Sequence, residues 1–230
     1  MRVLIIENTP GAPAGAFGQW LYEARGATLD VVTPETMPDT HGDADLIVTL
    51  GSPAGAWEDI GWVHRQRRLV QDALAAGKPV IGICFGAQLV ATAIGGRAAP
   101  MDERCFTGWH ANEDVADPVW QGPWVRWHAD HLEVPAGTEV LARDKGTVQV
   151  FHHRSPSGGN AVGVQFHPEA GPDSANLWAT KTPDMLARSG ATPAQIARDG
   201  AALDGHAARL DALFTEMLRR AGVAPKGGLP

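Results

Sequence analysis

The stretch from Lys78 to Gln88, with the sequence KPVIGICFGAQ, decides the fold. Its apolar residues predict a buried strand that ends at Cys84, and a helical pattern from Ala87 to Ile94 follows at once. Gly82 and Gly86 leave room for the crowded backbone of so sharp a turn. The sequence therefore predicts a strand, a tight turn and a helix, with a thiol at the turn.

The predicted turn favours a reactive form of Cys84. A helix that begins directly behind the cysteine directs free N–H groups and the positive end of its dipole towards the sulfur, which favours thiolate over thiol. A lone cysteine is more often a small buried hydrophobic residue. Here the Gly-x-Cys-x-Gly pattern after an apolar strand instead favours a nucleophile that faces solvent above the sheet.

This motif resembles the nucleophile motif of class I glutamine amidotransferases. The match runs through GKPVIGICFGAQLVATAIGG at residues 77–96. Within that family the chain resembles a stand-alone amidotransferase domain of the GMP-synthase kind. The resemblance implies a flavodoxin-like three-layer α/β domain, with a mostly parallel central sheet, helices on both faces and a small antiparallel extension.

The first part of the chain has the pattern of such a sheet. Val3–Ile6 predicts a buried strand, Thr28–Val32 and Asp45–Leu50 predict two more strands, and amphipathic segments at 17–25 and 62–76 predict helices. Alternation of this kind predicts a parallel sheet that is covered on both faces. Ligands of such sheets bind beyond the carboxyl ends of the strands.

The second part has a different pattern. Residues 101–170 predict shorter strands in a partly antiparallel extension, ending with a buried strand at Ala161–Phe166. Helices then return, and the last of them has an apolar face that starts at Leu203. We expect residues 1–230 to form a single domain, in which 174–230 is a C-terminal helical extension.

Three positions in that extension predict helix starts. Ser174 precedes an apolar segment, and the pairs Thr182-Pro183 and Thr192-Pro193 each place a capping hydroxyl before a first-turn proline.

His167-Pro168-Glu169 follows the last apolar strand, 83 residues after Cys84. A cysteine nucleophile needs a base, and the base needs a group that orients it. Side chains two residues apart in an extended segment project to the same side, so Glu169 is within reach of His167. An isolated His-Pro-Glu is more often a surface turn. Together with the preceding GVQF, however, it matches the family's triad, and the resemblance implies catalytic Cys84, His167 and Glu169.

The resemblance also implies an oxyanion hole. LGSPAGAWEDIGW, at residues 50–62, is similar to the family's oxyanion loop. Gly51 would supply one amide donor for the tetrahedral oxyanion and Phe85 the other. Without the cysteine motif, a plain Gly-Ser-Pro turn would be the better interpretation.

Three further residues are implied to bind substrate. Gln88 matches a position that contacts glutamine in the family. RWHADHLEVPAG, at residues 126–137, resembles the family's His-Gly-Asp segment. By this resemblance Asp130 would pair with the α-ammonium group and His128 would shape the pocket, although Ala129 stands where glycine is common.

Composition argues against several other classes. The net charge is −7 and the 19 basic residues form no long run, so we expect no nucleic-acid partner. The apolar run near the N-terminus is too short for a signal peptide or membrane span. With only Cys84 and Cys105, we expect no disulfide framework, a cytoplasmic location and an incidental, half-buried Cys105. The nine histidines form no ligand array, so we expect no metal and no cofactor.

The expected reaction is hydrolysis of the γ-amide of L-glutamine through a cysteinyl thioester. The ammonia would go to a separate synthase partner, since the chain has neither a P-loop nor residues left for a synthase domain.

Two alternatives stay open. One is a free-standing γ-glutamyl hydrolase or peptidase with a wider leaving-group pocket, and the other is a non-catalytic regulatory or binding protein on the same fold. Four tryptophans are candidates for the wider pocket: Trp57, Trp62, Trp109 and Trp127.

Overall fold

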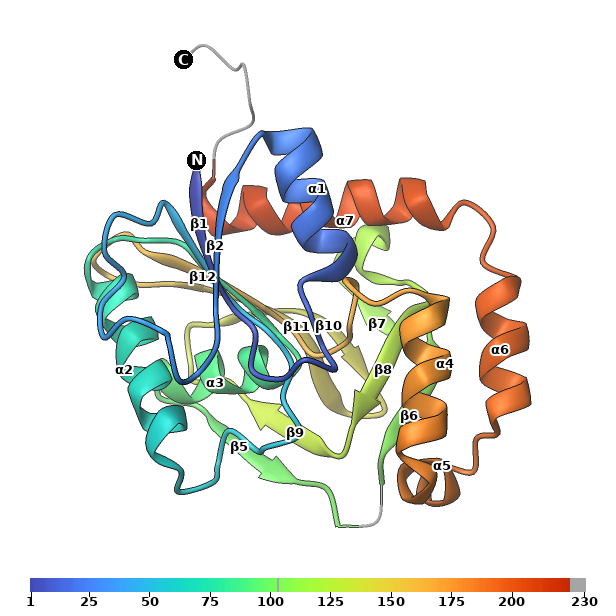
Figure 1. Cartoon of the computed structure of the whole chain (residues 1–230). Coiled ribbons are helices and arrows are strands. Elements are labelled where there is room, and N and C mark those ends of the chain that lie inside the picture. Colours follow the sequence, from blue (N-terminus) through green and yellow to red (C-terminus); the bar gives the residue numbers. More distant parts are fainter. Residues whose placement is uncertain (103, 224–230) are drawn as a thin grey trace.

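β4 (Val80–Ile83), the strand before Cys84, lies in the middle of an eight-stranded sheet (Figure 1). The computed structural model describes residues 1–102 and 104–223. From edge to edge, the strands of this sheet are β2 (Thr28–Val32), β1 (Arg2–Ile6), β3 (Leu46–Thr49), β4, β12 (Asn160–Val164), β11 (Thr147–Arg154), β10 (Glu139–Asp144) and β7 (Asp114–Val115). The strand predicted before the turn is confirmed.

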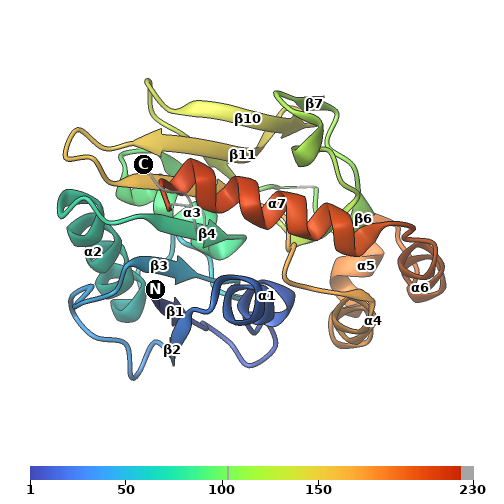
Figure 2. The same ribbon diagram turned by 90° about the horizontal axis from the view of Figure 1, so that it is seen from above.

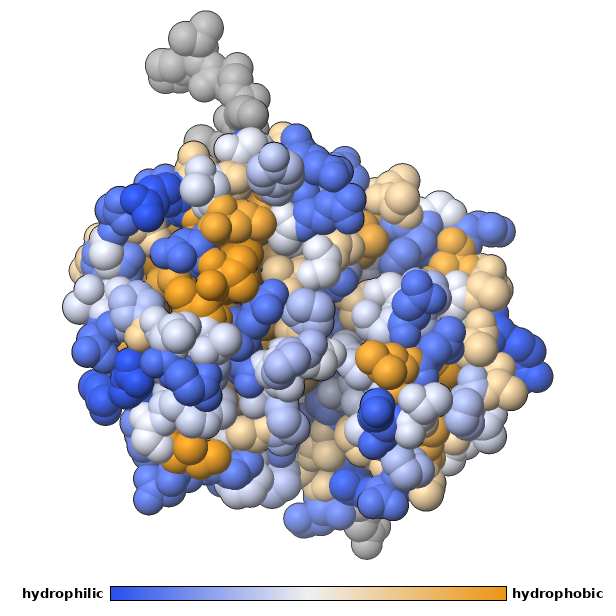
Figure 3. Space-filling model, in the orientation of Figure 1, coloured by the Kyte–Doolittle hydropathy of each residue, from blue (hydrophilic) through white to orange (hydrophobic). Residues whose placement is uncertain are grey.

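The larger part of the sheet is parallel. β2, β1, β3, β4 and β12 run in one direction, and Ile81 of β4 pairs with Val48 on one side and with Val162 on the other. β11, β10 and β7 continue the sheet in antiparallel fashion. All residues of β4 are buried, because both faces of the sheet are covered. At the edge, β2 exposes Val31, and Figure 3 shows hydrophobic side chains gathered over this region.

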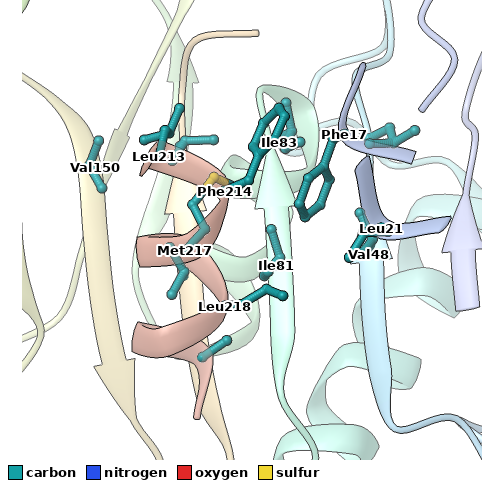
Figure 4. Packing of buried hydrophobic residues seen from close by; sticks show 14 of the residues in the cluster. Phe17, Leu21, Val48, Ile81, Ile83, Val150, Leu213, Phe214, Met217 and Leu218 are labelled. Atoms are coloured by element: carbon teal, nitrogen blue, oxygen red, sulfur yellow. The ribbon is translucent and has the colours of Figure 1, made fainter. Parts of the chain in front are cut away.

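α1 (Gly15–Arg25) and α7 (His206–Ala221) cover one face of the sheet (Figure 2). Phe17 of α1 and Phe214 of α7 contact each other with ring centroids 4.9 Å apart. Both belong to a buried cluster with residues of β4 (Figure 4). The predicted apolar face of the last helix is confirmed from Leu213 onward. Leu203 lies outside the helix, because Gly205, with a φ of +65°, occupies the N-cap position of α7.

α2 (Gly61–Ala75) and α3 (Phe85–Ala93) cover the other face. Trp62 of α2 packs on Phe85 of α3 with ring centroids 5.4 Å apart, so this tryptophan is partly buried against the core. The predicted three layers, helix, sheet and helix, are therefore present.

Two short antiparallel sheets form the predicted extension beyond α3. β5 (Arg97–Pro100) pairs with β9 (Asp130–Glu133), and β6 (Phe106–His110) pairs with β8 (Trp124–His128). A 3-10 helix at Pro118–Trp120 lies between β7 and β8.

α4 (Pro172–Lys181), α5 (Pro183–Ser189) and α6 (Pro193–Ala201) lie beside β6 and β8 (Figure 1). No helix in the described ranges is long and apolar enough to cross a membrane.

The predicted helix starts hold only in part. α4 begins at Pro172 rather than at Ser174, because a proline is accepted in the first turn. The Thr192 hydroxyl accepts a hydrogen bond from the amide of Gln195 at 3.2 Å and caps α6 as predicted. Thr182 does not cap α5 through its side chain, since its hydroxyl donates to the carbonyl of Trp178 at 2.9 Å.

Candidate active site

Cys84 lies at a sharp turn between β4 and α3, with a φ of +53° and a ψ of −111°. This conformation is costly for a residue with a side chain, so the surrounding packing must hold it in place. A methyl group on Gly82 would clash with the backbone of Gly86, and one on Gly86 would clash with the carbonyl of Thr49. The prediction that the turn needs both glycines is confirmed.

α3 begins at Phe85, two residues earlier than the sequence pattern indicated. The Phe85 amide therefore belongs to the first turn, where N–H groups have no acceptor within the helix. The sequence predicted that the sulfur of Cys84 faces solvent. This prediction is wrong, because Cys84 is only 5% exposed. It lies at a cavity instead, since neighbouring loops rise above the end of the sheet.

His167 and Glu169 form a buried pair beside this cavity. His167 Nδ1 and Glu169 Oε1 are 2.7 Å apart, and the side chains are 4% and 2% exposed. The backbone of this turn is fixed as well, because the His167 amide donates to the carbonyl of Val125 at 2.7 Å. With Nδ1 engaged by Glu169, Nε2 is the ring nitrogen left for chemistry.

The electrostatics of His167 favour a charged imidazole. Burial alone lowers the pKa of His167, but the charges of Cys84 and Glu169 outweigh it and raise that pKa well above 6.5. A charged imidazole at His167 is therefore favoured beside the Cys84 sulfur.

The cavity has a volume of about 290 Å³. It brings together most of the residues that the sequence singled out, namely Cys84, Phe85, Gln88, His128, Asp130 and His167. Gly51 lies against the ring of His167, since a methyl group on it would come within 2.9 Å of Cε1. Glu169 stands behind His167 and does not line the cavity.

Gln88 is buried on the first turns of α3. Its Nε2 lies 3.4 Å from Oε1 of Gln165, and its own Oε1 has no hydrogen-bond partner among the described residues. Gln165 in turn points its Nε2 at the sulfur of Cys84, at 3.9 Å. A buried amide oxygen without a partner is available to a ligand.

His128 and Asp130 form another part of the cavity wall. Burial is the main cause that lowers the pKa of His128 to about 3, so the ring is neutral, and its Nδ1 lies 2.9 Å from the carbonyl of Asp130. Asp130 Oδ1 accepts a hydrogen bond from Trp57 Nε1 at 3.0 Å. Burial raises the pKa of the Asp130 carboxyl, which means that a cation placed beside it would be stabilising.

Two tryptophans form an apolar wall of the cavity. Trp127 and Trp178 lie with ring centroids 5.7 Å apart. Their N–H groups are engaged elsewhere, because Trp127 donates to the Thr182 hydroxyl at 2.9 Å and Trp178 donates to the carbonyl of Gly11 at 2.8 Å. The rings therefore present carbon to the cavity.

The four tryptophans proposed from the sequence divide between different places. Trp127 lines the cavity and Trp57 reaches its edge through Asp130, whereas Trp62 packs against the core and Trp109 lines a different cavity. Sequence reasoning missed Trp178, which lies on α4 and contacts the ring of His167. In the sequence, Trp178 was marked only by its position in a segment with an apolar helical pattern.

Both cysteines are free, and Cys105 is buried rather than half-buried. Burial raises the pKa of the Cys105 thiol, which makes it less reactive than a surface cysteine. Within residues 1–102 and 104–223, the His, Cys, Asp and Glu side chains form no group of three or more that could hold a metal ion.

The fold that carries this site is that of a known class of proteins. The family model of class-I glutamine amidotransferases matches residues 21–178, so the chain belongs to that family.

Among curated relatives, the chain is similar to a glutamine-hydrolyzing GMP synthase subunit of Halobacterium salinarum. The two are 31% identical over 175 residues, which cover 73% of this chain and 88% of the relative. The glutamine-hydrolyzing GMP synthase of Thermomicrobium roseum is 36% identical over 130 residues. These residues cover 54% of this chain but only 23% of that relative. The gamma-glutamyl-L-1-hydroxyisopropylamide hydrolase of a Pseudomonas species is 30% identical, with 56% of this chain and 48% of the relative covered.

Among solved structures, a glutamine amido transferase from Methylobacillus flagellatus superposes with a TM-score of 0.82. The alignment covers 99% of this chain and 97% of that one at 21% identity. The predicted flavodoxin-like fold is thereby confirmed.

Proposed function

We propose that the chain hydrolyses the γ-amide of L-glutamine by covalent catalysis at Cys84 and releases ammonia for a separate synthase partner. One observation carries the proposal: the cavity contains a cysteine at a strained turn together with a histidine whose imidazole is oriented by a buried glutamate. A thiol, a base and an orienting carboxylate are the groups that amide hydrolysis requires.

In the first step, the Cys84 thiolate attacks the γ-carbonyl carbon and a C–S bond forms. The carbonyl π electrons move to oxygen, and this oxyanion is stabilised by the Phe85 amide and by an amide at Gly51. The first is a free donor at a helix N-terminus, where the helix dipole adds to the effect.

In the second step, His167 gives its proton to the leaving nitrogen, the C–N bond breaks, and ammonia departs from a γ-glutamyl thioester. The neutral imidazole then takes a proton from water, whose oxygen attacks the thioester. The C–S bond breaks, glutamate leaves, and the thiolate with protonated His167 is regenerated. Throughout, Glu169 holds the imidazole by its Nδ1 and stabilises its charged form.

The α-amino end of glutamine would bind to Asp130. Its carboxylate has one oxygen bound to Trp57 and lies in a partly buried position, where an ammonium group gains most. Gln88 would accept a hydrogen bond from the substrate with its unpartnered Oε1, and neutral His128 would shape the wall.

A separate partner is supported by the relatives that are named as single subunits of GMP synthase, since this chain matches most of the length of one of them. We further propose that the chain is one domain with a C-terminal helical extension at 174–230. The chemistry needs Cys84 as a free thiol, which fits the proposed reducing, cytoplasmic setting.

A second candidate function is supported by the wall of Trp127 and Trp178. A free-standing γ-glutamyl hydrolase would place an apolar amine substituent against these rings, next to His167, where the leaving nitrogen must receive its proton. One relative carries the name of such a hydrolase.

Release of glutamate from glutamine and from γ-glutamyl alkylamides tests both candidates, with Cys84→Ala as the blank. Preference for glutamine supports the ammonia donor, and preference for alkylamides supports the hydrolase. Selective alkylation of Cys84 by an electrophilic glutamine analogue, read as a mass shift, is the control for a competent site. No turnover and no alkylation would leave the non-catalytic alternative.

A further inference from the structure

A second cavity lies next to the active site, behind α5. Its volume is about 300 Å³, and its walls come from β6, α5 and the start of α6. Figures 1 and 2 show these three elements side by side at one end of the molecule. None of the proposed catalytic steps uses this cavity.

The rim of the cavity is positively charged. Arg104, Lys145 and Arg188 all line it, against one carboxylate from Asp199, in a chain whose net charge is −7. Arg104 donates to the backbone carbonyl of Lys145 at 3.3 Å, which holds two of these cations close together. Within the ranges 1–102 and 104–223, neither Lys145 nor Arg188 forms an ion pair with a carboxylate. Lys145 Nζ also lies over the Phe106 ring at 5.7 Å, and the summed charge of the rim favours an anion.

The floor of the cavity is apolar and its side wall carries hydroxyl groups. Phe106 and Ile196 are 4% and 2% exposed and lie at the base, and Trp109 lines the cavity as well. The Thr107 and Ser189 hydroxyls are bound to each other at 2.6 Å, and Ser189 Oγ also donates to the carbonyl of Leu186 at 3.1 Å. Such a site fits a small molecule with an anionic group and a flat or apolar body.

The cavity shares its inner wall with the active site. Phe106 stacks on His128 with ring centroids 5.0 Å apart, and His128 lines the other cavity. α5 separates the two as well, since Met185 faces the active site and Arg188 faces the second cavity. The Cys105 thiol donates to the carbonyl of Met185 at 3.2 Å and ties β6 to this helix.

We infer that the second cavity is a binding site for a small organic phosphate monoester, and that its occupant changes substrate binding in the active site. A phosphate dianion offers several oxygens to the cations of the rim. The organic part would lie against Trp109, which is only partly buried. Because Met185 belongs to α5 and the Phe106 ring contacts His128, a shift of α5 or of this ring would displace residues that line the active site. The two cavities are therefore coupled through direct contacts.

Isothermal titration calorimetry on the full chain tests the binding. The probes are phenyl phosphate, ribose 5-phosphate and inorganic phosphate. We expect phenyl phosphate to bind at one saturable site, and more tightly than the other two because only its ring can stack on Trp109. We expect Arg188→Ala and Lys145→Ala each to weaken this binding about tenfold or more, the loss of one charge-assisted hydrogen bond.

Arg198→Ala is the matched control, because it removes an exposed cation of α6 that does not line the cavity. Its Kd should stay within about twofold of the parent value. Absence of saturable heat, or equal weakening by all three variants, would overturn the site. Thermal unfolding of each variant excludes loss of folding as the cause.

The effect of the second cavity on substrate binding is measured separately, through the KM for glutamine. Phenyl phosphate should change the KM for glutamine in the parent protein, and the concentration that gives half of this change should be about tenfold or more higher in Arg188→Ala. Binding without any change in KM would overturn the coupling. The calorimetric result does not depend on turnover, so failure of the proposed function and failure of this site are distinguishable.

Discussion

His167 and Trp178 pack against each other with ring centroids 4.8 Å apart and ring planes at 62°. The histidine follows a central strand, whereas the tryptophan belongs to α4, in the C-terminal helices. Trp178 is anchored in turn, because its N–H donates to Gly11. The C-terminal helices therefore take part in positioning the proposed base.

Truncation of this tryptophan should slow the reaction. Trp178→Ala removes the ring that holds the imidazole, and we expect kcat/KM for glutamine to fall about tenfold or more. Trp178→Phe keeps a ring beside His167 but loses the bond to Gly11, so its loss should be smaller. Equal activity of both variants with the parent, at unchanged Tm, would contradict a positioning role.

Neutralising Glu169 should change both the rate and the pH profile. Glu169→Gln should lower kcat/KM by about 10²- to 10⁴-fold, because the imidazolium loses its orienting charge. Glu169 raises the pKa of His167, so its removal lowers that pKa. Since the imidazolium is lost as pH rises through this pKa, the alkaline limb of kcat/KM should move to lower pH. An alkaline limb at the parent position would show that another group titrates there.

Asp130 should determine recognition of the substrate's α-amino group. Asp130→Asn should raise the KM for glutamine by about 10- to 100-fold, because it removes a charge-assisted hydrogen bond. Glutaramic acid, which has the same γ-amide but no amino group, is the control substrate. Its kcat/KM should be nearly equal in the parent and in Asp130→Asn. If the variant loses the same factor on both substrates, Asp130 acts in some other way.

The glycine at position 86 should be needed for stability. Gly86→Ala forces a methyl group onto the carbonyl of Thr49, and the free energy of unfolding should fall by about 1–3 kcal/mol or more. Gly61→Ala is the matched change, because nothing lies within 4 Å of the added methyl group at the start of α2. It should be neutral or stabilise by up to about 1 kcal/mol. Urea unfolding at one pH compares the two, and equal midpoints would refute the clash.

The parts that the sequence predicted well depend on neighbouring residues. The apolar run before Cys84 and the two glycines around it define the turn within a few residues, as His167-Pro168-Glu169 defines the buried pair. Backbone sterics and side-chain alternation act at this range, so a short stretch of sequence contains the information.

The parts that escaped prediction depend on contacts between distant segments. Trp178 reaches His167 only because α4 folds back over β8, and periodicity says nothing about that return. The hydroxyl of Thr182 shows the same limit: it has a good capping position, but the indole of Trp127 and the carbonyl of Trp178 engage it instead. The burial of Cys84 likewise follows from loops whose path over the sheet is a tertiary property.

The shape of the turn and its reactivity depend on different atoms. Gly82, Gly86 and Thr49 set the backbone, and none of them has a part in the reaction, which depends on one sulfur atom. Exchange of that sulfur for hydrogen, as in Cys84→Ala, would therefore leave a preformed receptor that retains its amide ligand unreacted. Such an inert form could serve as bait to recover the natural ligand from a cell extract. In evolution, one substitution would be enough to turn a hydrolase into a sensor.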